Sequence, residues 1–239
     1  KVYNNSGLFC NLKDARIENL VIDSSCLFSG NLSASLGVTA TGSVSLKGVK
    51  NNAGVNGVAI AGGFIAMMDE LEKDKVSLTF ESSVNNGNIT SVNTEEPEVA
   101  GGFIGIVWNN TSVLFSHCKN KGSIMASVAG GFAAAIKTKK NIIVNDCVND
   151  GMIFGYDGSF GGFFGGVENL ETSVSIRNSK NNGLINGTGV SGGFVGFCES
   201  SITIVHSTNT GNMNGGGSEG GLIGMVYLFD IPTNDRTIH

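Results

Sequence analysis

The chain of 239 residues contains little charge, because only 15% of its residues are Asp, Glu, Lys or Arg. This share is too small for a disordered tail, and the 41% of apolar residues is enough for a continuous core. The formal net charge is −5 and the 15 basic residues are scattered, whereas a phosphate-binding surface needs clustered Lys and Arg. The composition predicts a folded protein and argues against nucleic acid as a partner.

Long apolar runs are missing as well. No run approaches the ~18 consecutive apolar residues that a membrane-spanning helix needs, so we expect no membrane-spanning segment. Gathered carboxylates are also missing, because the repeated strand positions described below hold Ser, Thr, Asn and aliphatic residues. Polysaccharide-cleaving β-helices need carboxylates on one face. We therefore predict that the protein is not an enzyme and uses no cofactor.

Two histidines share one position of the repeat. His117 and His206 lie three coils apart, with Asp146 between them in the sequence. At one strand spacing per coil this separation is about 14 Å, so the histidines cannot form one catalytic pair.

What the chain does contain is a repeat. Gly-Gly-Phe or a close variant, followed by small and aliphatic residues, begins at Gly62, Gly101, Gly130, Gly161, Gly192 and Gly220. Two weaker copies lie upstream at 6–9 and 34–36. Regular returns of roughly 30 residues are typical of a solenoid built from one repeated coil. We expect a single domain over 1–239 that is a segment of a longer protein, because neither terminus carries a polar cap.

Each copy holds three short apolar or alternating runs, such as Val174–Ile176, Leu184–Ile185 and Gly192–Val195, with Gly and Asn between them. This pattern predicts three strands per coil. Stacked coils would pair each strand with its copy in the next coil. We therefore predict an all-β fold, a parallel β-helix (β-solenoid) with about seven coils of ~30 residues. A β-propeller is the rival fold, but it needs four strands per blade and usually longer repeats.

A column of asparagines marks one corner of the coil. It contains Asn51, Asn85, Asn120, Asn149, Asn181 and Asn209, with Ser24 at that place in the first copy. Stacked Asn side chains can form an amide ladder, each bonding the next. Gly follows two residues later in five of the six coils, and we attribute it to a positive φ at the turn. The ladder is predicted to be structural.

The Gly-Gly-Phe strand is apolar on both alternations, and only one of them can fill the core. We expect the other to form an exposed stripe of Ile65, Ile104, Phe164, Val195 and Ile223. Such a stripe usually marks an interface with another chain, or is covered by another part of the same protein. Either case predicts lateral association.

The five cysteines form an odd number, so at least one is free or pairs outside the chain. Cys118 and Cys147 occupy the same place in consecutive coils, about 4.8 Å apart, which a disulfide tolerates. Ser83, Ser179 and Ser207 fill the same column. The favoured interpretation is therefore a ladder of small buried residues, with a disulfide as the alternative.

Two insertions lengthen one copy, near 68–75 and 94–98, and hold seven of the twenty acidic residues. Insertions in solenoids form protruding loops that often bind partners. Solvated charged loops are the commoner case, and carboxylates on different corners are a weak case for a calcium site. We predict no metal.

Six sequons mark candidate glycosylation sites at Asn4, Asn31, Asn88, Asn109, Asn110 and Asn186. An exterior location would explain them. With so many Asn, Ser and Thr, about four or five would arise by chance, so they favour the exterior only slightly.

The segments 181–187 and 191–196 resemble the Gly-Gly-Leu/Phe-Val-Gly repeats, including the GLUG type, of large surface proteins in bacteria and protists. The likeness covers almost the whole chain, although the first two copies have lost the double Gly. It implies an extracellular or cell-surface solenoid with an adhesive or structural role, and it brings no catalytic residues. We expect a non-catalytic scaffold in adhesion, surface coating or fibre assembly. Its expected partners are proteins or further copies on the apolar strand face, with glycans as a second kind of ligand. A carbohydrate-binding or carbohydrate-cleaving β-helix is the alternative, and an intracellular structural repeat is a third.

Overall fold

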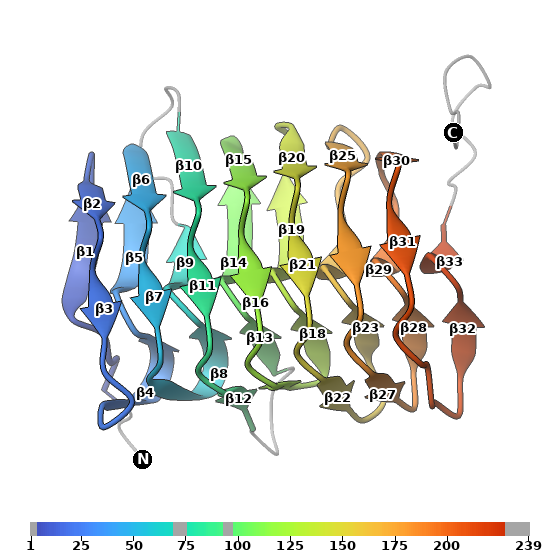
Figure 1. Cartoon of the computed structure of the whole chain (residues 1–239), viewed down its shortest axis with the longest axis horizontal. Helices are drawn as coiled ribbons and strands as arrows, with labels where there is room; N and C mark the ends of the chain where they lie inside the picture. Colours follow the sequence, from blue (N-terminus) through green and yellow to red (C-terminus); the bar gives the residue numbers. More distant parts are fainter. Residues whose placement is uncertain (1–3, 69–75, 93–97, 228–239) are drawn as a thin grey trace.

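The computed structural model describes residues 4–68, 76–92 and 98–227. Its strands all pair in parallel and stack as a β-solenoid of about 7 turns with ~29 residues per turn (Figure 1). None of the residues in these ranges is helical. The predicted parallel β-helix is confirmed.

The strands form four sheets that run the length of the solenoid. Sheet 1 contains β1 (Phe9–Lys13), β5 (Gly37–Thr41), β9 (Ile65–Met68), β14 (Ile104–Asn109), β19 (Ala133–Thr138), β24 (Phe164–Val167), β29 (Val195–Cys198) and β33 (Ile223–Val226). Sheet 2 contains β2 (Arg16–Glu18), β6 (Ser43–Lys47), β10 (Val76–Glu81), β15 (Thr111–Ser116), β20 (Ile142–Asn145), β25 (Ser173–Arg177) and β30 (Ser201–Val205). Sheet 3 contains β3 (Val21–Ile22), β7 (Lys50–Asn51), β11 (Val84–Asn85), β16 (Lys119–Asn120), β21 (Val148–Asn149), β26 (Lys180–Asn181) and β31 (Thr208–Asn209).

Sheet 4 begins with two long strands, β4 (Leu27–Ala34) and β8 (Gly54–Gly62). Later coils divide this length into two rows that both start from β8. The first row contains β12 (Ile89–Ser91), β17 (Ile124–Met125), β22 (Ile153–Gly155) and β27 (Ile185–Gly187). The second row contains β13 (Val99–Gly101), β18 (Val128–Gly130), β23 (Ser159–Gly161), β28 (Val190–Gly192) and β32 (Ser218–Gly220).

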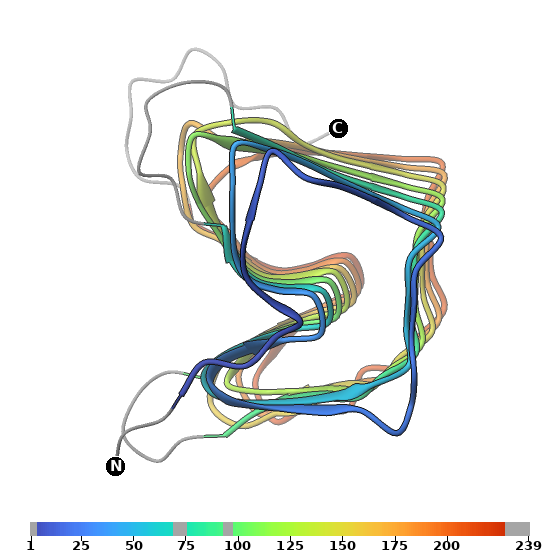
Figure 2. The ribbon, with the colours of Figure 1, turned by 90° about the vertical axis from the view of Figure 1, so that its left-hand side faces the viewer.

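Each coil is therefore divided more finely than the three predicted strands. The corner asparagine lies in a two-residue strand of its own, as in β26. Gly-Gly-Phe is a bend between strands, because β28 ends at Gly192 and β29 begins at Val195. Figure 2 looks along the solenoid and shows its outline indented on the side where the chain passes from sheet 4 into sheet 1. We call this bend the inward corner.

The inward corner fills the centre of the coil with aromatic rings. Its phenylalanines stack from coil to coil, with ring centroids 4.7–5.0 Å apart. The stack contains Phe64, Phe103, Phe132, Phe163 and Phe194, which are all fully buried. Phe80 and Phe115 of sheet 2 meet these rings edge to face, for example at 5.2 Å between Phe80 and Phe103. Such ring pairs stabilise a core beyond the area they bury.

The left-handed corner of the coil lies between sheets 2 and 3. Its residues have φ between 49° and 62° in every coil and are Asn19, Gly48, Ser82, His117, Asp146, Asn178 and His206. Asn, Asp, His and Gly tolerate this conformation better than other residues. His117, Asp146 and His206 are thus corner residues of separate coils.

Candidate functional site

The most regular polar feature is the predicted ladder of buried asparagines in sheet 3. Each Nδ2 atom donates to the Oδ1 atom of the next Asn over 2.8–2.9 Å, from Asn51 through to Asn209. The first five members also donate to a carbonyl two residues later in their own coil. Asn51, Asn85, Asn120, Asn149 and Asn181 are completely buried. Buried amides need such partners, and here each coil supplies them to the next.

The ladder is closed at both ends. In the first coil Ile22 pairs with Asn51, so Ile22, and not Ser24, occupies the equivalent place. At the other end Asn209 donates to Gly221 O over 2.9 Å, while its Oδ1 atom accepts from Gly211 N.

The glycines that follow the ladder have a different role from the predicted one. Gly87, Gly122, Gly151, Gly183 and Gly211 do not have positive φ; among the described glycines only Gly42 and Gly48 do. A Cβ atom on Gly122 would instead lie 1.9 Å from Gly87 O in the neighbouring coil. The prediction of a positive φ there is wrong, and close approach of the coils is the reason for glycine.

Close contacts also explain why the inward corner has two glycines. A Cβ atom on Gly101 would lie 1.8 Å from Ile104 O, which closes the bend. A Cβ atom on Gly131 would lie 2.3 Å from Gly162 O and 2.6 Å from Asn149 Oδ1. The corner therefore ends against the asparagine ladder.

The predicted exposed stripe lies in the core. Ile65, Ile104, Phe164 and Val195 are completely buried, and Ile223 packs against the same cluster in the last coil. The reason is the inward corner, which turns both its Phe and the residue after it toward the interior. The interpretation of this stripe as an exposed interface is therefore wrong.

A second, smaller apolar cluster lies between the outer side of sheet 1 and the second row of sheet 4. It contains Val99, Ile106, Ala134 and Ala135, with Ile60, Trp108 and Val128 at its margin. At the same margin the Lys137 ammonium group lies 5.3 Å from the Trp108 ring centroid and 2.9 Å from a carboxylate oxygen of Glu168. The two walls of the indentation thus pack on each other.

Cys118 and Cys147 are free, buried thiols within a ladder of small residues. Backbone N–H groups donate to the next side chain along the column: Val49 N to Ser83 Oγ, Cys118 N to Cys147 Sγ, Cys147 N to Ser179 Oγ and Ser179 N to Ser207 Oγ. Burial raises the pKa of the Cys147 and Cys198 thiols. The structure therefore has the stacked ladder rather than the disulfide.

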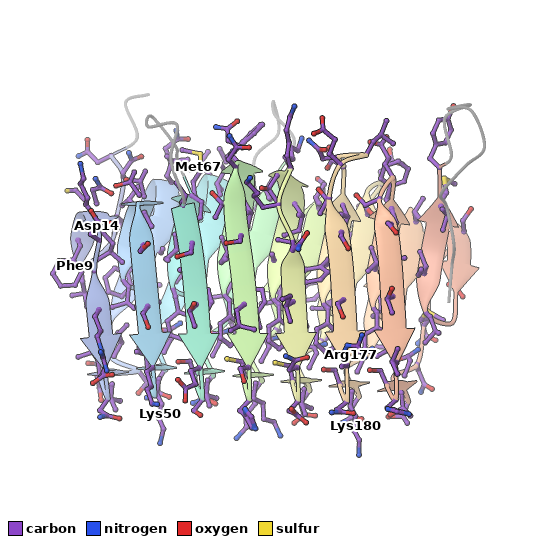
Figure 3. The ribbon with its side chains drawn as sticks, turned by 90° about the horizontal axis from the view of Figure 1, so that it is seen from above. Phe9, Asp14, Lys50, Met67, Arg177 and Lys180 are labelled. Atoms are coloured by element: carbon purple, nitrogen blue, oxygen red, sulfur yellow. The ribbon has the colours of Figure 1, made fainter. Side chains whose placement is uncertain are left out.

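The outer face of sheet 2 carries short hydroxyl side chains (Figure 3). The first row holds Ser43, Ser77, Ser112, Ser173 and Ser201, with Asn141 between Ser112 and Ser173. The second row holds Ser45, Thr79, Ser175 and Thr203, with Leu114 and Ile143 between Thr79 and Ser175. Longer side chains stand at the margins, among them Lys50 and Lys180 on sheet 3. Lys47 pairs with Glu81 at 2.8 Å and Lys119 with Asp150 at 2.5 Å.

The sequon asparagines differ in exposure. Asn4, Asn88, Asn109 and Asn186 are exposed, whereas Asn31 and Asn110 are half-buried. Of the two insertions, residues 69–75 and 94–97 lie outside the described ranges. Glu98 is the last residue of the second insertion, and its carboxylate accepts from Ser127 Oγ over 3.2 Å.

Within the described ranges no three His, Cys, Asp or Glu side chains gather as a metal site would require. Those residues also include no helix of the length and apolarity needed to cross a bilayer. His117 Nδ1 lies 2.9 Å from Ser116 Oγ, on the surface. The ladders and the exposed faces are therefore what the structure offers for a functional interpretation.

Comparisons of the chain with protein-family models, with curated proteins and with solved structures gave no significant match.

Proposed function

We propose that the protein is a non-catalytic repeat scaffold outside the cell or on its surface, acting in adhesion, surface coating or fibre assembly. The observation that carries the proposal is the continuous asparagine ladder, which joins six consecutive coils through buried amides. Together with the phenylalanine stack it makes a stiff body in which the repeated polar side chains serve coil stacking. The exposed sequons and the resemblance to Gly-Gly-Phe-Val-Gly surface repeats favour the exterior.

A second candidate is a carbohydrate-binding β-helix, favoured by the hydroxyl rows on sheet 2. Ser77 Oγ donates to Ser43 Oγ over 3.2 Å, so two neighbouring hydroxyl groups of one row already form a hydrogen bond with each other. Hydroxyl groups both donate and accept hydrogen bonds, as do sugar hydroxyls. An extended glycan along the solenoid axis would meet one row position per coil.

A glycan array followed by product analysis tests both. Binding without cleavage that is lost in a Thr79→Lys, Ser175→Lys variant would support the carbohydrate-binding scaffold. An Asn56→Lys change on sheet 4 is the control. Release of new reducing ends by the intact protein would overturn the scaffold proposal.

A further inference from the structure

The outer face of sheet 4 carries an apolar patch in the interior coils, around β22 and its neighbour β27 (Figure 1). Ile153 of β22 lies in the core, so Met152 and Phe154 on either side of it face outward. Tyr156 follows β22 and is 73% exposed, and Met152 is 40% exposed. The neighbouring coils add two half-buried side chains to the same face. The sheet 4 patch consists of Met125, Met152, Phe154, Tyr156 and Leu184.

Polar side chains occupy the same columns in the other coils. The column of Phe154 contains, in order, Asn56, Thr90, Met125, Phe154 and Asn186. The column two residues earlier contains Asn88, Ser123, Met152, Leu184 and Asn212. Amides and hydroxyls therefore border the patch on both sides along the solenoid axis. Coil stacking does not require the apolar residues, because Asn and Thr serve the same positions elsewhere.

Tyr156 lies on a corner of the coil whose length differs between neighbouring coils. Two residues separate Met125 from Val128, whereas four separate their paired residues Phe154 and Ser159. The coil that contains β22 thus has an insertion of two residues at this corner, and Tyr156 belongs to it. Insertions in solenoids map to loops on one face, which is often the binding face.

The loop that presents Tyr156 is held by the coils on both sides. Asp157 has φ +55°, and its N–H group donates to Thr188 Oγ1 of the next coil over 2.9 Å. A Cβ atom on Gly158 would collide with Ser127 O of the preceding coil, so the loop lies directly against that coil. A ring on a loop that is already ordered loses little conformational entropy when a ligand binds to it.

We propose that the sheet 4 patch binds neutral glycans, with a sugar ring stacked on the side chain of Tyr156. The proposal rests on the adhesive role proposed above and names a class of ligand for it. The face of an aromatic ring carries partial negative charge, and it attracts the weakly positive C–H groups on one side of a sugar ring. Sugar hydroxyls need donors and acceptors. Exposed groups of both kinds lie beside Tyr156, on Asp157, Asn186 and Thr188.

The size and charge of the patch favour a glycan over a second copy of the chain or a lipid surface. The patch has five side chains, whereas a stable protein interface uses about 20–30 residues on each side. Lys and Arg, which attract an anionic membrane, occupy none of the patch positions and none of the polar positions that border them. Asp157 adds a negative charge, which such a membrane would repel.

A microarray of neutral oligosaccharides of glucose, galactose, mannose and N-acetylglucosamine tests the proposal. We expect the intact chain to bind at least one of these probes. Tyr156→Ala should weaken that binding about tenfold or more in titration calorimetry, because the stacked ring is lost. Tyr156→Phe keeps the ring and should retain the binding. Tyr227→Ala removes a tyrosine that is 48% exposed and outside the patch, and it is the matched control. Circular dichroism shows whether each variant is folded.

Unchanged binding in Tyr156→Ala, or no binding by the intact chain, would overturn the proposal. Loss of binding in the Thr79→Lys, Ser175→Lys variant would also overturn it, because sheet 2 would then be the glycan surface. So would a dimer in sedimentation velocity that Tyr156→Ala returns to the monomer, since the patch would then join two copies. The scaffold function fails separately, if product analysis detects cleavage.

Discussion

Gly102 and Asn120 meet in the interior of the solenoid, where a Cβ atom on Gly102 would lie 2.7 Å from the Oδ1 atom of Asn120. The same contact recurs between Gly162 and Asn181, at 2.6 Å. The two repeated motifs of the sequence, the double glycine and the asparagine corner, are thus opposite sides of one contact. The inward corner therefore reaches the ladder, and a side chain larger than hydrogen at this glycine would separate them.

A glycine with positive φ and a glycine at a close contact between coils should respond differently to substitution by Asn. Gly48 has φ +62°, and Asn19 and Asn178 hold its place in other coils. Gly48→Asn should therefore change the free energy of unfolding by less than about 1 kcal/mol. Gly122→Asn should cost about 3 kcal/mol or more, because its Cβ would collide with a backbone carbonyl. Urea denaturation of both variants measures the difference, and equal losses would contradict the close-approach explanation.

The sequence predicts the parts of this fold that depend on repetition alone. The asparagine column could be found because a buried amide recurs at one place in every coil. The role of Gly122 could not, since it depends on how closely the neighbouring coil approaches. Period-two alternation predicts an exposed face for Ile104, because it assumes that a strand continues. The bend at Gly102 and Phe103 ends that alternation and turns two successive side chains inward.

Because the residues of the predicted stripe lie in the core, a charged substitution among them should destabilise the fold. Ile104→Asp places an unpaired carboxylate in the core and should reduce the free energy of unfolding by about 4 kcal/mol or more, or prevent folding. Ile143→Asp, on the outer face of sheet 2 and 38% exposed, is the control and should melt within a few degrees of the unchanged protein. A folded Ile104→Asp variant with altered association would instead show that the stripe is an interface.

The thiols should react in two groups. Cys10 and Cys26 are exposed and should react with a thiol reagent in the folded protein, whereas Cys118, Cys147 and Cys198 are buried. The raised pKa of Cys147 and Cys198 slows them further at neutral pH, since the thiolate is the reactive form. We expect two thiols before unfolding in guanidinium and five after it. Only three after unfolding would indicate a disulfide.

Asp150 gives a pH dependence of known sign. Its partial burial acts to raise the pKa, but hydrogen bonds from Lys119 and Asn182 hold it below the ordinary 3.8. Because the pKa of Asp150 is lower in the folded state than in the unfolded state, its ionised carboxylate stabilises the fold at pH values above the unfolded pKa. This stability is lost as the pH falls through the folded pKa. Asp150→Asn should therefore destabilise the protein by less than about 1 kcal/mol at pH 7, and by nothing measurable in strong acid. A loss of stability in Asp150→Asn that is as large in strong acid as at pH 7 would contradict this explanation.

The central claim, that the buried asparagine ladder holds the coils together, is tested most directly by comparing Asn120→Ala with Asn86→Ala in equilibrium denaturation followed by the fluorescence of Trp108, the single tryptophan. Asn120→Ala removes the bond from the Asn85 amide to the next coil, which leaves that amide only its bond to Gly87 O, and it leaves the Oδ1 atom of Asn149 without the donor from Asn120. It should cost about 3 kcal/mol or more, because each unsatisfied buried group costs about 1–3 kcal/mol. Asn86→Ala removes one exposed bond to Asn52 and should cost less than about 1 kcal/mol. Equal, small losses in both variants would contradict the account.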